Sequence, residues 1–242
     1  MRWIMIILFL VCTNAGVFAQ TKIVDLQCEL YRTYIDDRMD QWPGLIEQLE
    51  ALGDSSVSAQ KEILLARYGL IGYYLGNERK DEARDELTLA FEQVERAKLK
   101  YPKEAAFYCI DACLHAYQIA LSMVQAPVYY ARHQAALRKA EELNESEPLL
   151  SFEQANMLFY KPRLLGGNKK EAIQLYQKTL ELMGQQKCPD CCWFKMMVEL
   201  FLLKAYYETD DEKAFDTLLV SLHKNHGELS WINKFLDSQV IE

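Results

Sequence analysis

Residues 63–94 decide the fold, and they read ILLARYGLIGYYLGNERKDEARDELTLAFEQV. Apolar residues recur three and four positions apart from Ile63 to Leu75 and again from Ala83 to Val94, which is the period of an amphipathic helix. The polar stretch that begins at Gly76-Asn77 separates the two runs. A connection this short makes consecutive helices antiparallel, so the stretch predicts a helical hairpin.

The same period continues on both sides of this hairpin. Ten Gly and six Pro in 242 residues are few, and the alternation of Val, Ile and Thr that indicates strands is nearly absent. Turn residues interrupt the apolar runs at 53–56, 101–102, 126–127, 166–168 and 209–211. The sequence therefore predicts an all-α fold of stacked antiparallel hairpins, with about ten to eleven helices in a single domain over residues 20–242. Asn168, followed three residues later by Glu171, predicts a helix N-cap.

A small residue stands early in every second predicted helix. Small side chains at this place let the two helices of a hairpin approach closely, so their repetition predicts a stack of similar hairpins. The early positions are Gly44, Ala83, Ala131, Ala172 and Ala214, and a second small residue follows seven positions later at Ala51, Ala90, Thr179 and Ser221, with Arg138 as the exception.

These positions resemble those of the tetratricopeptide-like family of helical repeats. Tyr74, Ala83, Leu87 and Ala90 match its aromatic residue near the end of the first helix and its three positions on the second helix. The later units match fewer positions, and their spacing exceeds the family period of roughly 34 residues. The resemblance implies a TPR-like α-solenoid, and residues 156–172 are similar to an element of exported bacterial proteins in this group.

The first residues predict export. A single cation precedes an apolar run over residues 3–11, and the small Val17 and Ala19 follow. This is the layout of a secretory signal peptide over residues 1–19, because a membrane span needs roughly 20 apolar residues. Cleavage after Ala19 predicts a mature chain in the periplasm or outside the cell. Lipidation of Cys12 is the weaker alternative, since a bulky residue stands where a small one should precede that cysteine.

Charge and motifs exclude several classes of function. The formal net charge of −8 repels phosphate backbones, and no local cluster of Lys and Arg offsets it along the sequence, which argues against nucleic acid as a partner. The chain shows no nucleophile elbow and no Gly-rich oxyanion loop, and its four histidines lack metal-site spacing with acidic partners. We therefore expect no enzyme activity, no cofactor and no metal.

Six cysteines remain after residue 19, which is typical of a disulfide-containing exported protein. They are Cys28, Cys109, Cys113, Cys188, Cys191 and Cys192. Cys188 and Cys191 begin a predicted helix with the spacing of a Cys-x-x-Cys pair, and we expect a structural disulfide between them. Reduced thiols, and redox or metal chemistry, are the alternatives for this segment.

Aromatic doublets and one basic turn supply the candidate binding residues. Adjacent helical residues point about 100° apart, so each Tyr-Tyr doublet can place one ring in the core and one at a surface. The Lys-Pro-Arg step after residue 160 puts two cations at a helix end, where an acidic ligand could bind. Core packing and a kinked helix end are the simpler interpretations. The candidate partner-binding residues are Tyr74, Tyr130, Tyr160, Lys161, Arg163 and Tyr207.

Two functions are compatible with stacked hairpins in an exported protein. The first is a non-enzymatic protein–protein interaction module in the periplasm or cell envelope, with a protein or peptide partner on a concave surface. The second is a small-ligand-binding or transport-accessory protein with an apolar pocket between the hairpins.

Overall fold

The computed structural model describes residues 22–185 and 191–237, and all regular structure within them is helical, which confirms the predicted all-α class. None of the described helices is long and apolar enough to span a membrane. The signal peptide predicted over residues 1–19 lies outside the described residues. An N-terminal helical segment, residues 22–35, precedes η1 (Met39–Gln41), α2 (Trp42–Ala51), α3 (Val57–Gly76), α4 (Lys80–Lys100), α5 (Ala105–Leu121), η2 (Met123–Gln125), α6 (Ala126–Leu143), α7 (Pro148–Tyr160), η3 (Arg163–Leu165), α8 (Lys169–Gly184), α9 (Trp193–Tyr207), α10 (Glu212–His226) and α11 (Ile232–Asp237).

Side-chain caps fix where α3 and α8 begin. The Ser56 hydroxyl accepts a hydrogen bond from the Ala59 N–H at the start of α3. The Asn168 side chain accepts one from the Glu171 N–H at the start of α8, which confirms the predicted N-cap. Each cap satisfies a backbone donor that has no partner inside its own helix.

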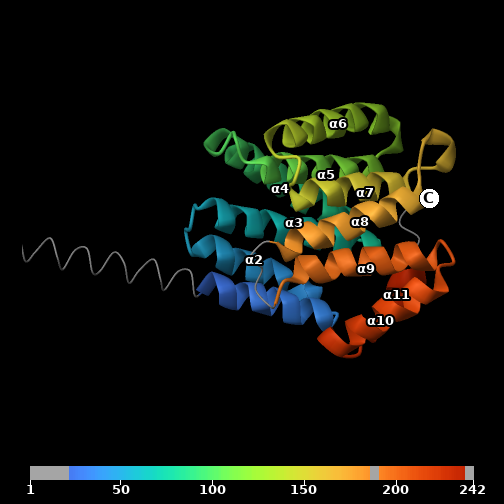
Figure 1. Cartoon of the computed structure of the whole chain (residues 1–242). Helices are drawn as coiled ribbons and strands as arrows, with labels where there is room; N and C mark the ends of the chain where they lie inside the picture. The colour runs from blue at the N-terminus through green and yellow to red at the C-terminus, as the bar shows by residue number, and fades with distance from the viewer. Residues whose placement is uncertain (1–21, 186–190, 238–242) are drawn as a thin grey trace, which may run out of the picture.

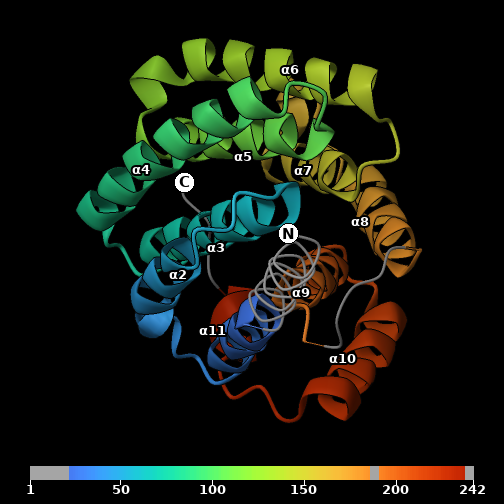
Figure 2. The ribbon, with the colours of Figure 1, turned by 90° about the vertical axis from the view of Figure 1, so that its left-hand side faces the viewer.

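Consecutive helices are antiparallel, and the odd-numbered helices lie inside the even-numbered ones (Figures 1 and 2). Viewed along the helix axes in Figure 2, α2, α4, α6, α8 and α10 form an outer arc around α3, α5, α7 and α9. The most extensive packing joins the two helices of each hairpin, α3 with α4, α5 with α6, and α7 with α8. Each inner helix packs against other helices on several sides, so it needs apolar residues around nearly its whole circumference.

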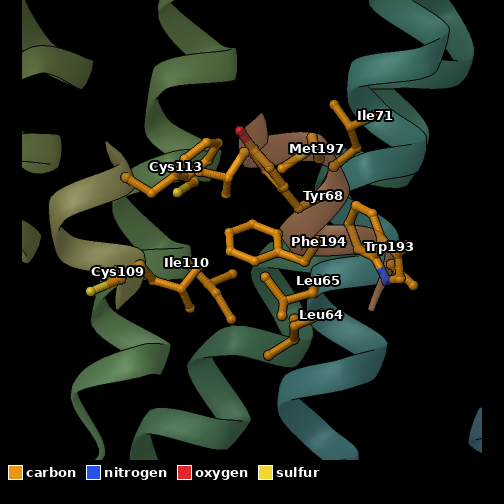
Figure 3. Close-up of a cluster of buried hydrophobic side chains, with 14 of the residues drawn as sticks. Leu64, Leu65, Tyr68, Ile71, Cys109, Ile110, Cys113, Trp193, Phe194 and Met197 are labelled. Atoms are coloured by element: carbon orange, nitrogen blue, oxygen red, sulfur yellow. The ribbon is translucent and has the colours of Figure 1, made fainter. Parts of the chain in front are cut away.

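Helix α3 shows this requirement most clearly. Its buried residues occur on every side of the helix, including Leu64, Leu65, Tyr68 and Ile71. Figure 3 shows these side chains facing Phe194 of α9 and the inner side of α5. Gly69 is required here, because a Cβ at this position would lie 2.6 Å from the Trp42 ring. The core of the molecule is therefore centred on α3, α5 and α9.

The small-residue pattern is confirmed in two hairpins and is wrong in the others. Ala83 and Ala90 of α4 are fully buried, as are Ala172 and Thr179 of α8. In contrast, Gly44, Ala51, Ala131 and Ser221 are exposed and Ala214 is half-buried. A small side chain permits close approach but does not enforce it, since the larger apolar residues decide which face a helix buries.

The N-terminal helical segment packs against the C-terminal part of the described chain, and we call this contact the closing seam. A disulfide joins Cys28 to Cys191, with 4.9 Å between their Cα atoms. The Trp231 indole N–H donates to the Ile35 carbonyl at 2.8 Å, and the Tyr31 hydroxyl shares a 2.6 Å hydrogen bond with His226 Nδ1. The helices therefore close on themselves instead of leaving two free ends.

The disulfide corrects the predicted bond between Cys188 and Cys191. Cys191 is bonded to Cys28, and Cys188 lies outside the described residues. The predicted pairing considered only neighbours in sequence, whereas the fold brings Cys28 across 163 residues to the start of α9. A disulfide is typical of an oxidising compartment, which agrees with export.

Candidate functional site

Four inter-helix turns gather at one end of the molecule. The odd-numbered inner helices run in one direction, so the turns that follow α3, α5, α7 and α9 all lie at the right-hand end of Figure 1. We call the surface formed by these four turns the turn face. All six predicted binding residues belong to helix ends or turns at this face, and five of them reach its surface: Tyr130, Tyr160, Lys161, Arg163 and Tyr207.

The turn between α7 and α8 is held in a fixed shape by its own backbone. The Leu165 N–H and the Gly167 N–H both donate to the Pro162 carbonyl, at 2.8 and 3.1 Å. A Cβ at Gly167 would lie 1.7 Å from the Lys161 carbonyl oxygen, so this position admits only glycine without rearrangement. Gly166 has a φ of 96°, which also favours glycine. The turn presents its side chains on a rigid support.

Tyr130 and Lys161 connect the α5–α6 side of the turn face to the α7–α8 turn. Lys161 Nζ lies 3.3 Å from the Tyr130 hydroxyl, to which it donates, and 5.2 Å from the centre of the ring. The Tyr130 ring is nearly parallel to that of His133, at 6.4 Å. His133 is itself fixed by a 2.8 Å hydrogen bond to the buried Glu153 carboxylate. A cation beside a supported aromatic face is a common recognition element.

Tyr160 is the last residue of α7 and Tyr207 the last of α9, so both also stand at the turn face. Lys169 Nζ forms a 2.6 Å ion pair with the Glu208 carboxylate, which joins the start of α8 to the end of α9. Burial raises the pKa of Tyr160, and the nearby Glu208 charge raises that pKa further. The Tyr160 hydroxyl therefore stays neutral over the physiological pH range. Tyr130, Tyr160 and Tyr207 are 37%, 38% and 48% exposed, so each offers part of a ring while the rest is packed.

Tyr74 does not belong to the exposed part of this surface. Only 8% of Tyr74 is exposed, and the Arg79 guanidinium lies 4.5 Å from its ring centre. The prediction that Tyr74 is available to a partner is therefore wrong, because the polar turn after α3 folds back over the ring. The last doublet behaves as the helical geometry predicts, with Tyr206 buried and Tyr207 exposed.

Aliphatic side chains on the turn face are the feature that sequence reasoning missed. Leu164 is 98% exposed and Val124 is 93% exposed, with Met123 and Leu165 also largely exposed. Met123 and Val124 stand in the turn just before Pro127, and Leu164 and Leu165 stand in the turn just before Gly166. From the sequence, none of these four residues was predicted as a surface feature. Their position inside a tight turn could have predicted this exposure, because a side chain in such a turn rarely reaches the core.

A cleft lies beside the disulfide, away from the turn face. It has a volume of about 160 Å³, and Trp193 and the half-buried Glu62 contribute to its lining. Gln27 Nε2 donates to Glu62 at 2.8 Å, and Trp193 Nε1 donates to the other carboxylate oxygen at 3.3 Å. Lys61 forms a 3.1 Å ion pair with Glu147 at its rim. Pockets that enclose drug-sized ligands occupy roughly 300–1,000 Å³, so this cleft is too small to enclose one.

The described residues hold no grouped metal ligands, and two of their thiols are buried and not activated. Burial raises the pKa of the Cys109 and Cys113 thiols, so neither is poised as a thiolate. Across residues 22–185 and 191–237, no group of three or more His, Cys, Asp or Glu side chains is placed to hold a metal ion. We take the turn face, with its partly exposed tyrosine rings beside a lysine, as the candidate site.

Comparison with known proteins finds a structural similarity to a haemophore and no match by sequence. No protein-family model matches the chain, and no curated protein matches it. The HusA haemophore from Porphyromonas gingivalis has a similar structure, with a TM-score of 0.58 at 18% sequence identity. The match covers 77% of this chain and 94% of that protein. At this identity the similarity shows a shared fold, and the TPR-like resemblance of the sequence stays a prediction.

Proposed function

We propose that this protein is an exported carrier that binds an apolar small ligand on the turn face. The observation that carries this proposal is the group of partly exposed tyrosine rings, Tyr130, Tyr160 and Tyr207, with Lys161 over the first of them. Aromatic rings bury large apolar area at little cost in side-chain entropy, and a neighbouring cation adds recognition of an anionic group. The proposal follows the small-ligand alternative and not the protein-interaction module.

A tetrapyrrole is the first ligand class to test. The structural neighbour is a haemophore, and haem is a flat apolar ring that carries two carboxylates. A flat ring can lie on a row of tyrosines without an enclosed cavity, which suits a protein whose cleft beside the disulfide is small. Lys161 and Arg163 stand at the edge of that row and can pair with the carboxylates.

Export supports the same role. The Cys28–Cys191 disulfide fits an oxidising compartment, and the predicted leader over residues 1–19 would direct the chain there. A carrier in the periplasm or outside the cell needs no catalytic group. Its ligand has to be held reversibly, which a partly open surface site allows better than a closed pocket.

Titration with haemin, and with iron-free protoporphyrin, tests the proposed function. We expect saturable binding of at least one of them by ligand absorbance, and Tyr130→Ala should weaken it by about 10-fold because a central ring is lost. Tyr108→Ala is the matched control. Tyr108 also lies beside a lysine, with Lys98 Nζ 5.8 Å from its ring centre, but it belongs to the first turn of α5, at the opposite end of that helix from the turn face.

Two results would overturn the proposal. One is the absence of saturable binding of either tetrapyrrole by the folded protein. The other is an equal loss of affinity in the Tyr130→Ala and Tyr108→Ala variants, because a site on the turn face cannot depend on a ring at the other end.

A further inference from the structure

The fold brings together two stretches that contain no acidic residue. Residues 112–140 include η2 and the start of α6, and residues 161–170 form the turn before α8. Neither contains Asp or Glu, although the whole chain has a net charge of −8. The Lys161–Tyr130 contact joins the two stretches at the turn face. Their cations at this face are Arg132, Lys161, Arg163, Lys169 and Lys170.

The two most exposed aliphatic side chains, Leu164 and Val124, stand at the same place, each beside a second exposed aliphatic residue. Leu164 and Leu165 are 98% and 66% exposed on the rigid α7–α8 turn, and Met123 and Val124 are 72% and 93% exposed on the α5–α6 turn. A side chain that is almost fully exposed has no protein wall beside it, so it cannot help to enclose a small ligand. Such a side chain can instead insert into a fluid apolar layer. Exposed apolar patches of this kind mark interaction surfaces.

We infer that these two turns dock the protein onto a membrane surface that carries anionic headgroups. The four aliphatic side chains enter the boundary between headgroups and acyl chains, and the surrounding cations contact lipid phosphates. The contact is peripheral, because none of the described helices can span a bilayer. The backbone hydrogen bonds to the Pro162 carbonyl hold the turn in one shape, with the leucines exposed. Docking therefore costs little conformational entropy.

A lipid surface fits these turns better than a protein partner does. A protein interface has a core of residues that pack against complementary walls, whereas these aliphatic tips protrude singly from two turns. Four of the five cations belong to the stretch that carries the two leucines, and Arg132 belongs to α6, so an anionic surface that meets the leucines also meets cations. Lys169 already pairs with Glu208, so Lys161, Arg163 and Lys170 are the cations that matter most.

Vesicle flotation tests this inference with the exported, disulfide-bonded protein. We expect binding to vesicles of phosphatidylcholine with about one third phosphatidylglycerol, and at least 5-fold weaker binding to pure phosphatidylcholine. Leu164→Asp with Leu165→Asp should reduce binding to the anionic vesicles by at least 5-fold. Leu99→Asp is the matched control, because Leu99 is 83% exposed between Lys98 and Lys100 at the other end of α4.

A second pair of substitutions separates charge from apolar insertion. Arg163→Gln with Lys170→Gln should lower binding to anionic vesicles and reduce its dependence on salt, while circular dichroism stays unchanged. Three results would overturn the inference: no binding to anionic vesicles, equal binding to neutral ones, or an equal loss with Leu99→Asp. A Leu164→Gln/Leu165→Gln variant, which keeps the charge, should lose vesicle binding but keep its tetrapyrrole affinity, so this test and that of ligand binding can fail independently.

Discussion

The closing seam and the turn face use apolar side chains in opposite ways. At the closing seam, Tyr34 lies among the rings of Trp42, Trp193 and Trp231, at centroid distances of 5.6 to 6.2 Å. Tyr34, Trp42 and Trp193 are each 9% exposed or less. At the turn face, Leu164 and its neighbours stand in solvent on a rigid turn. The seam therefore contributes stability and the turn face offers binding surface. A substitution at the closing seam should therefore leave binding unchanged, and a substitution at the turn face should leave stability unchanged.

The largest effect should come from opening the closing seam. Trp193 is 2% exposed and its ring lies 4.8 Å from that of Trp42. Trp193→Ala should lower the free energy of unfolding by about 3–5 kcal/mol, because it leaves a cavity in the core. Urea unfolding measures this change. Tyr207→Ala on the turn face is the comparison, and a similar loss there would contradict the division between the two regions.

Removal of the disulfide should have the next largest effect. Cys28→Ser with Cys191→Ser should lower the free energy of unfolding by about 2–4 kcal/mol, because the unfolded chain is no longer constrained. Tetrapyrrole affinity of the folded variant should equal that of the parent protein. A large fall in affinity with intact circular dichroism would mean that the binding site includes the seam.

Gly167→Ala should disturb the turn face alone. The added Cβ cannot remain 1.7 Å from the Lys161 carbonyl oxygen, so the turn has to change shape, at a cost of about 1–3 kcal/mol. Vesicle binding should fall, because the leucines lose their fixed direction. Gly184→Ala is the control, since nothing lies within 4 Å of a Cβ there, and it should leave vesicle binding unchanged.

The smallest expected effect is a pH dependence that originates at the seam. Burial raises the pKa of Glu62. The hydrogen bonds from Gln27 and Trp193 lower that pKa by less than burial raises it. The folded state then binds the proton more tightly than the unfolded state. Stability should fall as pH rises from the ordinary carboxyl pKa through the raised one. Glu62→Gln should flatten this part of the curve of unfolding free energy against pH, and an unchanged slope would show that another group is responsible.

Sequence reasoning could predict those features that depend on neighbours along the chain. The helical period and the Asn168 cap are local, and the structure confirms both. Partners far apart in sequence could not be predicted, since nothing near Cys191 indicates that Cys28 lies beside it. The burial of Tyr74 depends on how Arg79 folds back after a turn. The exposure of Leu164 depends on the absence of a neighbour, which composition does not reveal.

Hydrogen exchange with and without a bound tetrapyrrole tests the central claim most directly. We predict that the ligand slows exchange in residues 121–134, 157–170 and 204–211, which contain the three turns of the turn face that carry Tyr130, Tyr160 and Tyr207. Exchange around the cleft at the disulfide, in residues 58–65 and 191–197, should not change. Protection confined to that cleft, with none at the turn face, would contradict the account.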